Sequence, residues 1–221
     1  NHKAFTGRSG TFFGYEGLGS IYWHMVSKLL LAVEECCQQA IDTNQSAEIV
    51  GKMLEHYYEI NEGIGVHKSP QLYGAFPIDP YSHTPTGKGA QQPGMTGQVK
   101  EDILSRIGEL GVFVKGGEIN FRPGLLKRDE FLKTAKTFQY VDISQQSREI
   151  SLIADTLAFT YCQVPVIYRI AESEGIELFY TNGNSSTTDQ LTIDKNTSHQ
   201  VFNRTGEIDR IQVNLKEDLF K

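Results

Sequence analysis

The sequence predicts an α+β protein, with helices in its first half and an antiparallel β-sandwich in its second. Up to about residue 110 the apolar residues follow helical spacing, and after Gly111 they alternate with polar ones. A long segment rich in Gly, Pro and polar side chains, residues 73–98, precedes the last helix. We therefore expect a helical segment over residues 1–111 and a jelly-roll-like sandwich over residues 112–221.

The first predicted helix covers residues 20–42 and carries two apolar stripes, one through Leu29 and Cys36 and one through Leu30 and Cys37. A helix that is apolar on more than one face is buried on more than one side. Three such helices cannot cover one another completely, and the chain does not begin with Met. We therefore expect it to be a piece of a longer protein with more helices upstream.

The second and third helices are expected over residues 46–60 and 96–110. Ser46 and Thr96 are N-cap candidates, since their hydroxyls can accept from free backbone N–H groups. The apolar residues at helical spacing are expected to be buried, namely Ile49, Val50, Met53, Leu54, Tyr57 and Tyr58 in the second helix and Val99, Ile103, Leu104, Ile107 and Leu110 in the third. Gly111 then ends the third helix.

The second half begins with a predicted hairpin. Val112 and Val114, then Ile119 and Phe121, alternate across a Gly116–Gly117 turn. Further strands are expected over residues 137–143, 150–153, 157–170, 176–180, 190–193, 199–203 and 208–215. Many short strands separated by turn residues are typical of a sandwich.

Composition excludes several classes of function. The 221 residues include 21 basic and 27 acidic ones, a net charge of −6, which argues against nucleic acid or a membrane surface as partner. No apolar run approaches the roughly 20 residues of a membrane helix, and no signal peptide opens the chain, which favours the cytoplasm. The three cysteines argue against a disulfide framework and are expected to be small buried residues. No Cys or His pair has the spacing of a metal site.

Three segments in this order resemble the C-terminal end of the cellobiose phosphorylase-like family. They are Thr96-Gly97 at a helix start, GVFVKGGEINFRPGLL from Gly111, and DRIQVNL near the end of the chain. The resemblance implies the last helices of an α/α toroid followed by a β-sandwich, in a protein that acts on glycosidic bonds by phosphorolysis or hydrolysis. It also implies that the general-acid Asp lies upstream of residue 1, so the fragment alone is expected to be inactive.

Inorganic phosphate is the one co-substrate that the resemblance implies, and no other cofactor is expected. In the family a Thr-Gly pair helps to bind phosphate, and Thr96-Gly97 at a helix start supplies free N–H groups and the positive end of the helix dipole. Lys88, between two glycines, is a second candidate phosphate contact. The alternatives are that Thr96 is a simple helix cap and that Lys88 is a solvated loop residue.

The remaining candidates bind or cleave a sugar. Glycoside cleavage typically requires two carboxyl groups that flank the scissile bond. Asp79 and Glu16 are the candidates, because both are loop carboxylates with aromatic neighbours. The alternative for Asp79 is that it orders its own turn. The candidate substrate-binding residues supply flat faces or hydrogen-bonding groups: Tyr15, Trp23, Tyr81, His83, Gln91 and Gln92. The expected partners are an oligosaccharide and the upstream part of the same protein. The alternative function is a non-catalytic module that binds carbohydrate or another protein.

Overall fold

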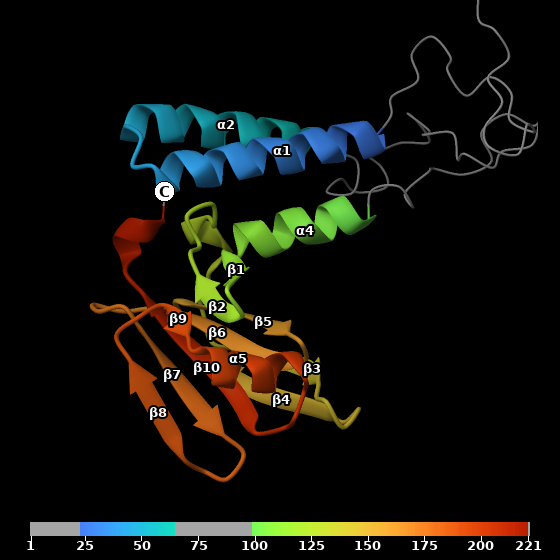
Figure 1. Ribbon diagram of the computed structural model, residues 1–221, viewed down its shortest axis with the longest axis vertical. Coiled ribbons are helices and arrows are strands. Elements are labelled where there is room, and N and C mark those ends of the chain that lie inside the picture. The colour runs from blue at the N-terminus through green and yellow to red at the C-terminus, as the bar shows by residue number, and fades with distance from the viewer. Residues whose placement is uncertain (1–22, 65–98, 221) are drawn as a thin grey trace, which may run out of the picture. The chain divides into compact units, whose positions relative to one another are not determined.

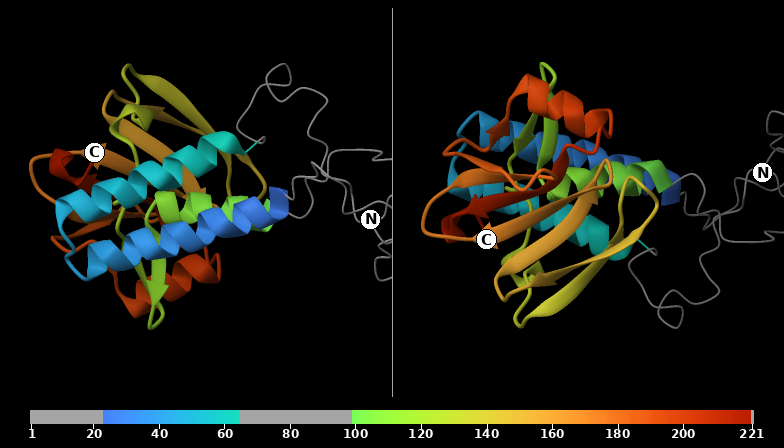
Figure 2. Two further views of the ribbon diagram at one scale, coloured as in Figure 1. Left: turned by 90° about the horizontal axis from the view of Figure 1, so that it is seen from above. Right: turned by 90° about the horizontal axis from the view of Figure 1, so that it is seen from below.

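The structure, a computed structural model, describes residues 23–64 and 99–220 (Figures 1 and 2). The chain divides into two compact units, Asn1–Arg106 and Ile107–Lys221. Helices dominate the described part of the first unit, and the second is built mainly from antiparallel strands. The α+β prediction is therefore confirmed.

In the first unit, α1 (Trp23–Asp42) and α2 (Ala47–Gly63) lie side by side and are joined by a short turn (Figure 1). Asn44 in this turn has a φ of 52°, which Asn tolerates better than most residues. Ser46 is the N-cap of α2, as predicted, and its hydroxyl accepts from the Ile49 N–H at 3.4 Å.

Burial in α1 and α2 follows one face of each helix. Leu30 and Cys37 are buried in α1, whereas Leu29 is 53% exposed, so the prediction of two buried stripes is wrong for α1. In α2, Val50, Leu54 and Tyr57 are buried as predicted, but Ile49 is 47% exposed. Spacing correctly predicted that both segments are helices, but not which of their apolar residues are buried.

α4 (Val99–Glu109) departs furthest from its prediction. Its buried residues include Glu101 and Ser105, each 3% exposed. Ile103 and Leu104, which we expected inside, are 54% and 49% exposed. Leu110 is buried as expected, and Ile107 packs against the core of the second unit. Among the described residues, the prediction is therefore wrong for Ile103 and Leu104 only.

Gly111 ends α4, as predicted, because no other residue fits its backbone. Its φ is +69°, and a Cβ placed there would lie 2.2 Å from the carbonyl carbon of Arg122. The Gly111 carbonyl accepts from the Arg122 N–H at 2.7 Å. This bond ties the end of the helix to the residue directly after β2.

The second unit contains three sheets among its described residues. β1 (Val112–Lys115) and β2 (Glu118–Phe121) form the predicted hairpin, and β9 (Thr192–Ile193) pairs with β2. β3 (Lys136–Val141) and β4 (Ser147–Leu152) form a separate hairpin. The strands of the largest sheet lie in the order β5 (Thr156–Tyr161), β6 (Val164–Ile170), β10 (Ile208–Leu215), β7 (Gly175–Tyr180) and β8 (Ser185–Thr188). The short helices η3 (Arg128–Glu130) and η4 (Glu217–Leu219) complete the unit.

One strand pair contradicts the prediction of a purely antiparallel arrangement. β10 pairs antiparallel with β7 but parallel with β6. The reason is topological: β6 and β7 run in opposite directions, and β10 is inserted between them. A strand in that position must be parallel to one of its two neighbours.

Three strand predictions were also wrong or incomplete. The expected strand over residues 157–170 is two strands, because Cys162 and Gln163 turn the chain with φ values of 50° and 65°. The expected strand over residues 199–203 lies in a helix, α5 (Lys195–Phe202), because Asp194 caps the N–H groups of Asn196 and Thr197. β8 was missed, since its four residues are all exposed and carry no apolar alternation.

A single apolar core joins the largest sheet to the β1-β2-β9 sheet. Ile119 and Phe121 from β2 belong to the same buried cluster as Val166 of β6 and Ile211 and Val213 of β10, and all five are fully buried. Such burial supplies most of the favourable free energy of folding. β10 is therefore buried at the centre of the largest sheet.

None of the three cysteines forms a disulfide bond, as expected, but only Cys37 is fully buried. Burial raises the pKa of the Cys37 thiol to about 11, so it is protonated at neutral pH. Cys36 is exposed and Cys162 is half-buried, so the expectation of burial is wrong for Cys36. None of the described helices combines the length and hydropathy required to cross a membrane.

We predict that Ser198→Ala destabilises the second unit. The Ser198 hydroxyl is fully buried, accepts from the Ile119 N–H and donates to the Ile193 carbonyl, each at 3.0 Å. Losing it leaves two buried backbone groups unpaired, at a cost of about 1–3 kcal/mol in the free energy of unfolding. Urea denaturation measures this loss. Ser185→Ala on the exposed strand β8 is the control, and an equal effect of both substitutions would contradict the prediction.

Candidate functional site

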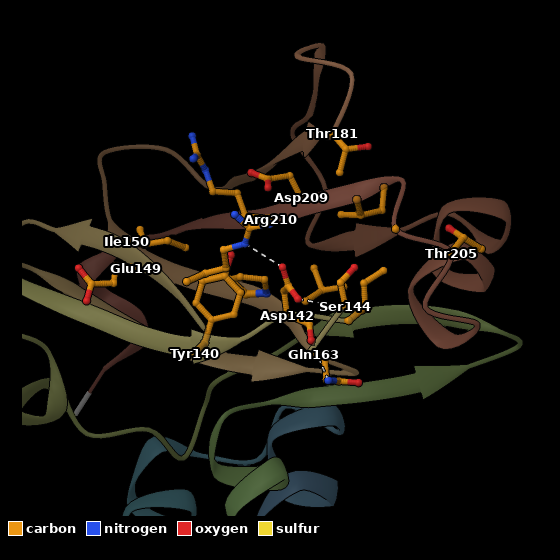
Figure 3. A pocket seen from close by; sticks show the side chains of 16 residues that line it. Tyr140, Asp142, Ser144, Glu149, Ile150, Gln163, Thr181, Thr205, Asp209 and Arg210 are labelled. Atoms are coloured by element: carbon orange, nitrogen blue, oxygen red, sulfur yellow. Dashed lines mark hydrogen bonds and ion pairs between the residues drawn. The ribbon is translucent and has the colours of Figure 1, made fainter. Parts of the chain in front are cut away.

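The second unit contains a cavity of about 620 Å³ between the β3–β4 hairpin and one end of the largest sheet (Figure 3). This volume falls within the range of small-molecule sites, roughly 300–1,000 Å³. Most such sites are mainly apolar, whereas here charged and hydroxyl-bearing side chains line much of the wall. The cavity therefore suits a polar ligand.

The β3–β4 hairpin forms the first wall, and its loop is ordered by Asp142. The Asp142 carboxylate accepts from the backbone N–H groups of Ser144 and Gln146 at 2.8 and 2.9 Å and from Arg148 Nε at 2.8 Å. The bond from Arg148 is the largest cause that lowers the pKa of Asp142, and the two backbone bonds add to it. Asp142 is thus ionised well below neutral pH, and much of its hydrogen-bonding capacity is occupied.

The β5–β6 turn contributes Gln163 and braces the hairpin. Gln163 Nε2 donates to the Asp142 carbonyl at 3.1 Å. A two-residue turn with two positive φ values is usually built from Asn and Gly, yet here it is Cys162-Gln163. Gln145 and Arg204, in or beside the segments that line the cavity, also have positive φ values, 61° and 51°. Backbone strain of this kind is characteristic of functional sites.

The third wall comes from the start of β10, where a β-bulge changes which side chains face the cavity. Opposite β7, Ile208 pairs with Tyr180 and Arg210 with Phe179, so that Asp209 is an extra residue on β10. Ile208 and Ile211 are both buried, and the two residues between them, Asp209 and Arg210, both line the cavity. Figure 3 draws them beside each other above Tyr140 and Asp142.

Arg210 is oriented by an aromatic ring. Its guanidinium carbon lies 3.9 Å from the centroid of the Phe179 ring. This stacking uses the face of the guanidinium and leaves the N–H donors at its edge available. Among the described residues, neither Arg210 nor Asp209 forms a side-chain hydrogen bond or ion pair. Both are therefore free to bind a ligand.

Tyr140 lies among the charged groups of the cavity. Burial is the main cause that raises the pKa of its phenol, and the negative charges of Asp209 and Asp142 raise it further, against the opposing effects of Arg148 and Arg210. The phenol is therefore protonated at neutral pH and can donate a hydrogen bond. Its ring provides a flat apolar surface in the cavity.

A comparison with models of known protein families found no match to the chain. A comparison with curated proteins found none either. The function must therefore be argued from the site itself.

Most of the residues that sequence analysis selected lie outside the described residues. They are Tyr15, Glu16, Asp79, Tyr81, His83, Lys88, Gln91, Gln92, Thr96 and Gly97. Trp23 is the first residue of α1. Within the described ranges no group of three or more His, Cys, Asp or Glu side chains is arranged to hold a metal ion.

The residues that line the cavity were all missed by sequence analysis, although one signal was present. In IDRIQVNL the buried residues are Ile208, Ile211, Val213 and Leu215. The first two are three positions apart in the sequence, whereas the later ones are two positions apart, as in a regular strand. That interruption of the alternation marks the bulge and thereby Asp209 and Arg210. Tyr140 and Gln163 gave no such signal, because only tertiary contacts bring them to the cavity.

We predict that Cys162→Asn gives a more stable protein than Cys162→Ala. Both substitutions remove the thiol, but Asn tolerates the left-handed conformation of residue 162 better than Ala does. The difference in the free energy of unfolding is expected to be about 1 kcal/mol, measured by urea denaturation. Equal stabilities would mean that the turn is not strained at this residue.

We also predict that the contribution of Asp142 to stability depends on pH. Because its pKa is lowered in the folded protein, its stabilising effect is full above the ordinary Asp value of about 3.9 and is lost as the pH falls through the folded value. Asp142→Asn should therefore lower the melting temperature at about pH 7 and lower it much less near pH 2. A deficit that stayed constant over this range would contradict the ion pair with Arg148.

Proposed function

We propose that the second unit binds carbohydrate in the cavity between the β3–β4 hairpin and the β10 bulge. The observation that carries this proposal is the combination of an aromatic face, Tyr140, with the free charged groups of Asp209 and Arg210. A sugar ring presents C–H groups on its faces and hydroxyls around its edge. An aromatic ring suits the first, and charged donors and acceptors suit the second.

The rings of Tyr140 and Phe138 support a ligand longer than one sugar. The two residues lie on the same side of β3, and their ring centroids are 5.8 Å apart with an interplanar angle of 11°. Only Tyr140 lines the cavity. Phe138 lies next to Tyr140 on β3, so a second sugar residue bound beside the first would lie close to this ring.

The electrostatics of the cavity favour binding over acid catalysis. Glycoside cleavage requires a carboxylic acid that is protonated near neutral pH, which in enzymes is a group with a raised pKa. The pKa of Asp142 is shifted in the opposite direction. Asp142 and Arg148 therefore serve better as a fixed part of the wall than as proton donors.

For the protein as a whole, we propose the architecture that the sequence resemblance implies. The helices would be the last of an α/α toroid and the second unit its jelly-roll-like sandwich, in a protein that phosphorolyses or hydrolyses glycosidic bonds. Exposed apolar side chains on the helices support this view: Leu29, Ile49, Ile103 and Leu104 are each about half exposed, as expected if further helices cover them.

We predict that Tyr140→Ala weakens carbohydrate binding. Isothermal titration of the chain with neutral oligosaccharides should yield heat of binding, and Tyr140→Ala should weaken the affinity at least about tenfold, since the ring supplies the apolar contact. Tyr140→Phe is the matched control, because it keeps the ring and loses one hydroxyl. It should retain most of the affinity.

Two outcomes would refute the proposal. One is the absence of binding across neutral, acidic and amino-sugar oligosaccharides. The other is binding that Tyr140→Ala leaves unchanged in a protein with native circular dichroism, which would place the ligand elsewhere.

A further inference from the structure

We infer that Asp209 and Arg210 together bind two neighbouring hydroxyls of a neutral sugar, so that the cavity selects uncharged sugars over acidic and amino sugars. This inference rests on the proposed function and names the chemical class of its ligand. It follows from the bulge, from the charged side chains on the cavity wall, and from which of these side chains already have a hydrogen-bond or ion-pair partner.

The bulge gives the two side chains a common direction. Consecutive residues in a regular strand face opposite sides of the sheet, so Asp209 and Arg210 would otherwise diverge. The extra residue between the pairs Ile208–Tyr180 and Arg210–Phe179 removes the alternation at this point. Asp209 and Arg210 therefore line one cavity from adjacent positions.

The other charged groups of the cavity are already engaged. Arg148 and Asp142 bind each other, and Glu149 accepts from Gln139 Nε2 at 2.7 Å. Asp209 and Arg210 have no such partner among the described residues, and Arg210 is held over the Phe179 ring by its face. These two groups are the acceptor and the donor that remain for a ligand.

A carboxylate and a guanidinium side by side match a pair of adjacent hydroxyls. The carboxylate of Asp209 accepts two O–H bonds, and the edge of Arg210 donates N–H bonds to the same two oxygens. An acidic sugar whose charge binds Arg210 would also bring that charge near Asp209, and an amino sugar whose charge binds Asp209 would bring its charge near Arg210. Either charge meets one favourable and one unfavourable partner, whereas neutral hydroxyls bind both.

Two substitutions and three kinds of probe test the inference. The variants Asp209→Asn and Arg210→Gln each remove one charge; the first keeps the side-chain size, and the second shortens the side chain but keeps it polar. The probes are the methyl pyranosides of glucose, galactose and mannose as neutral sugars, methyl glucuronide as an acid and methyl glucosaminide as an amine. Dissociation constants come from NMR chemical-shift titration of the ¹⁵N-labelled chain.

The unsubstituted chain should bind at least one neutral pyranoside more tightly than the acid or the amine. Each variant should weaken that binding about tenfold, because each loses a charge-assisted hydrogen bond. Arg210→Lys should be weakened as well, since Lys lacks the planar fork. Asp189→Asn and Arg169→Gln are the matched controls. Both residues are exposed and lie outside the cavity, so these variants should bind as the unsubstituted chain does.

The pattern of changes identifies each failure. If Asp209→Asn tightens binding of the glucuronide and Arg210→Gln abolishes it, the site is an anion site and the inference is wrong. If instead Arg210→Gln tightens binding of the glucosaminide and Asp209→Asn abolishes it, the site is a cation site and the inference is also wrong. If both variants bind a neutral sugar normally while Tyr140→Ala does not, the inference fails and the proposed function stands. If no pyranoside or oligosaccharide binds, the proposed function fails with it.

Discussion

The burial of β10 is the constraint on which the rest of the second unit depends. β10 pairs with both β6 and β7, and Ile211, Val213 and Leu215 are completely buried in the core. Ile208 must be buried too, and it is three residues from Ile211. A regular strand cannot bury both, so the chain inserts one extra residue. The core thus dictates the bulge, and the bulge creates the polar wall of the cavity.

The opposite wall depends on hydrogen bonds more than on burial. A single carboxylate, that of Asp142, holds the loop of the β3–β4 hairpin through two backbone N–H groups and Arg148. Gln163 then ties that loop to the β5–β6 turn. Because these hydrogen bonds already order the wall, little conformational entropy of the protein is lost when a ligand binds. This is the advantage of preorganisation. The strained turn at Cys162 and Gln163 is consistent with such a role.

The helices of the first unit show a different relation between pattern and burial. In α4 the carboxyl group of Glu101 and the hydroxyl of Ser105 are buried while Ile103 and Leu104 are exposed. Burying polar groups and exposing apolar ones are both unfavourable. Leu29 on α1 and Ile49 on α2 are likewise about half exposed. In these helices apolar spacing alone therefore does not decide which side chains are buried.

Local sequence determined the elements whose signals are local. Helical spacing, the Ser46 cap, the stop at Gly111 and the Gly116–Gly117 hairpin were all predicted correctly, because each depends on a few consecutive residues. Tertiary structure alone decided that β10 lies between β6 and β7, that Leu29 and Ile103 are exposed, and that Tyr140 and Gln163 line one cavity. Those outcomes depend on contacts between residues far apart in the chain, whose pairing no local pattern encodes.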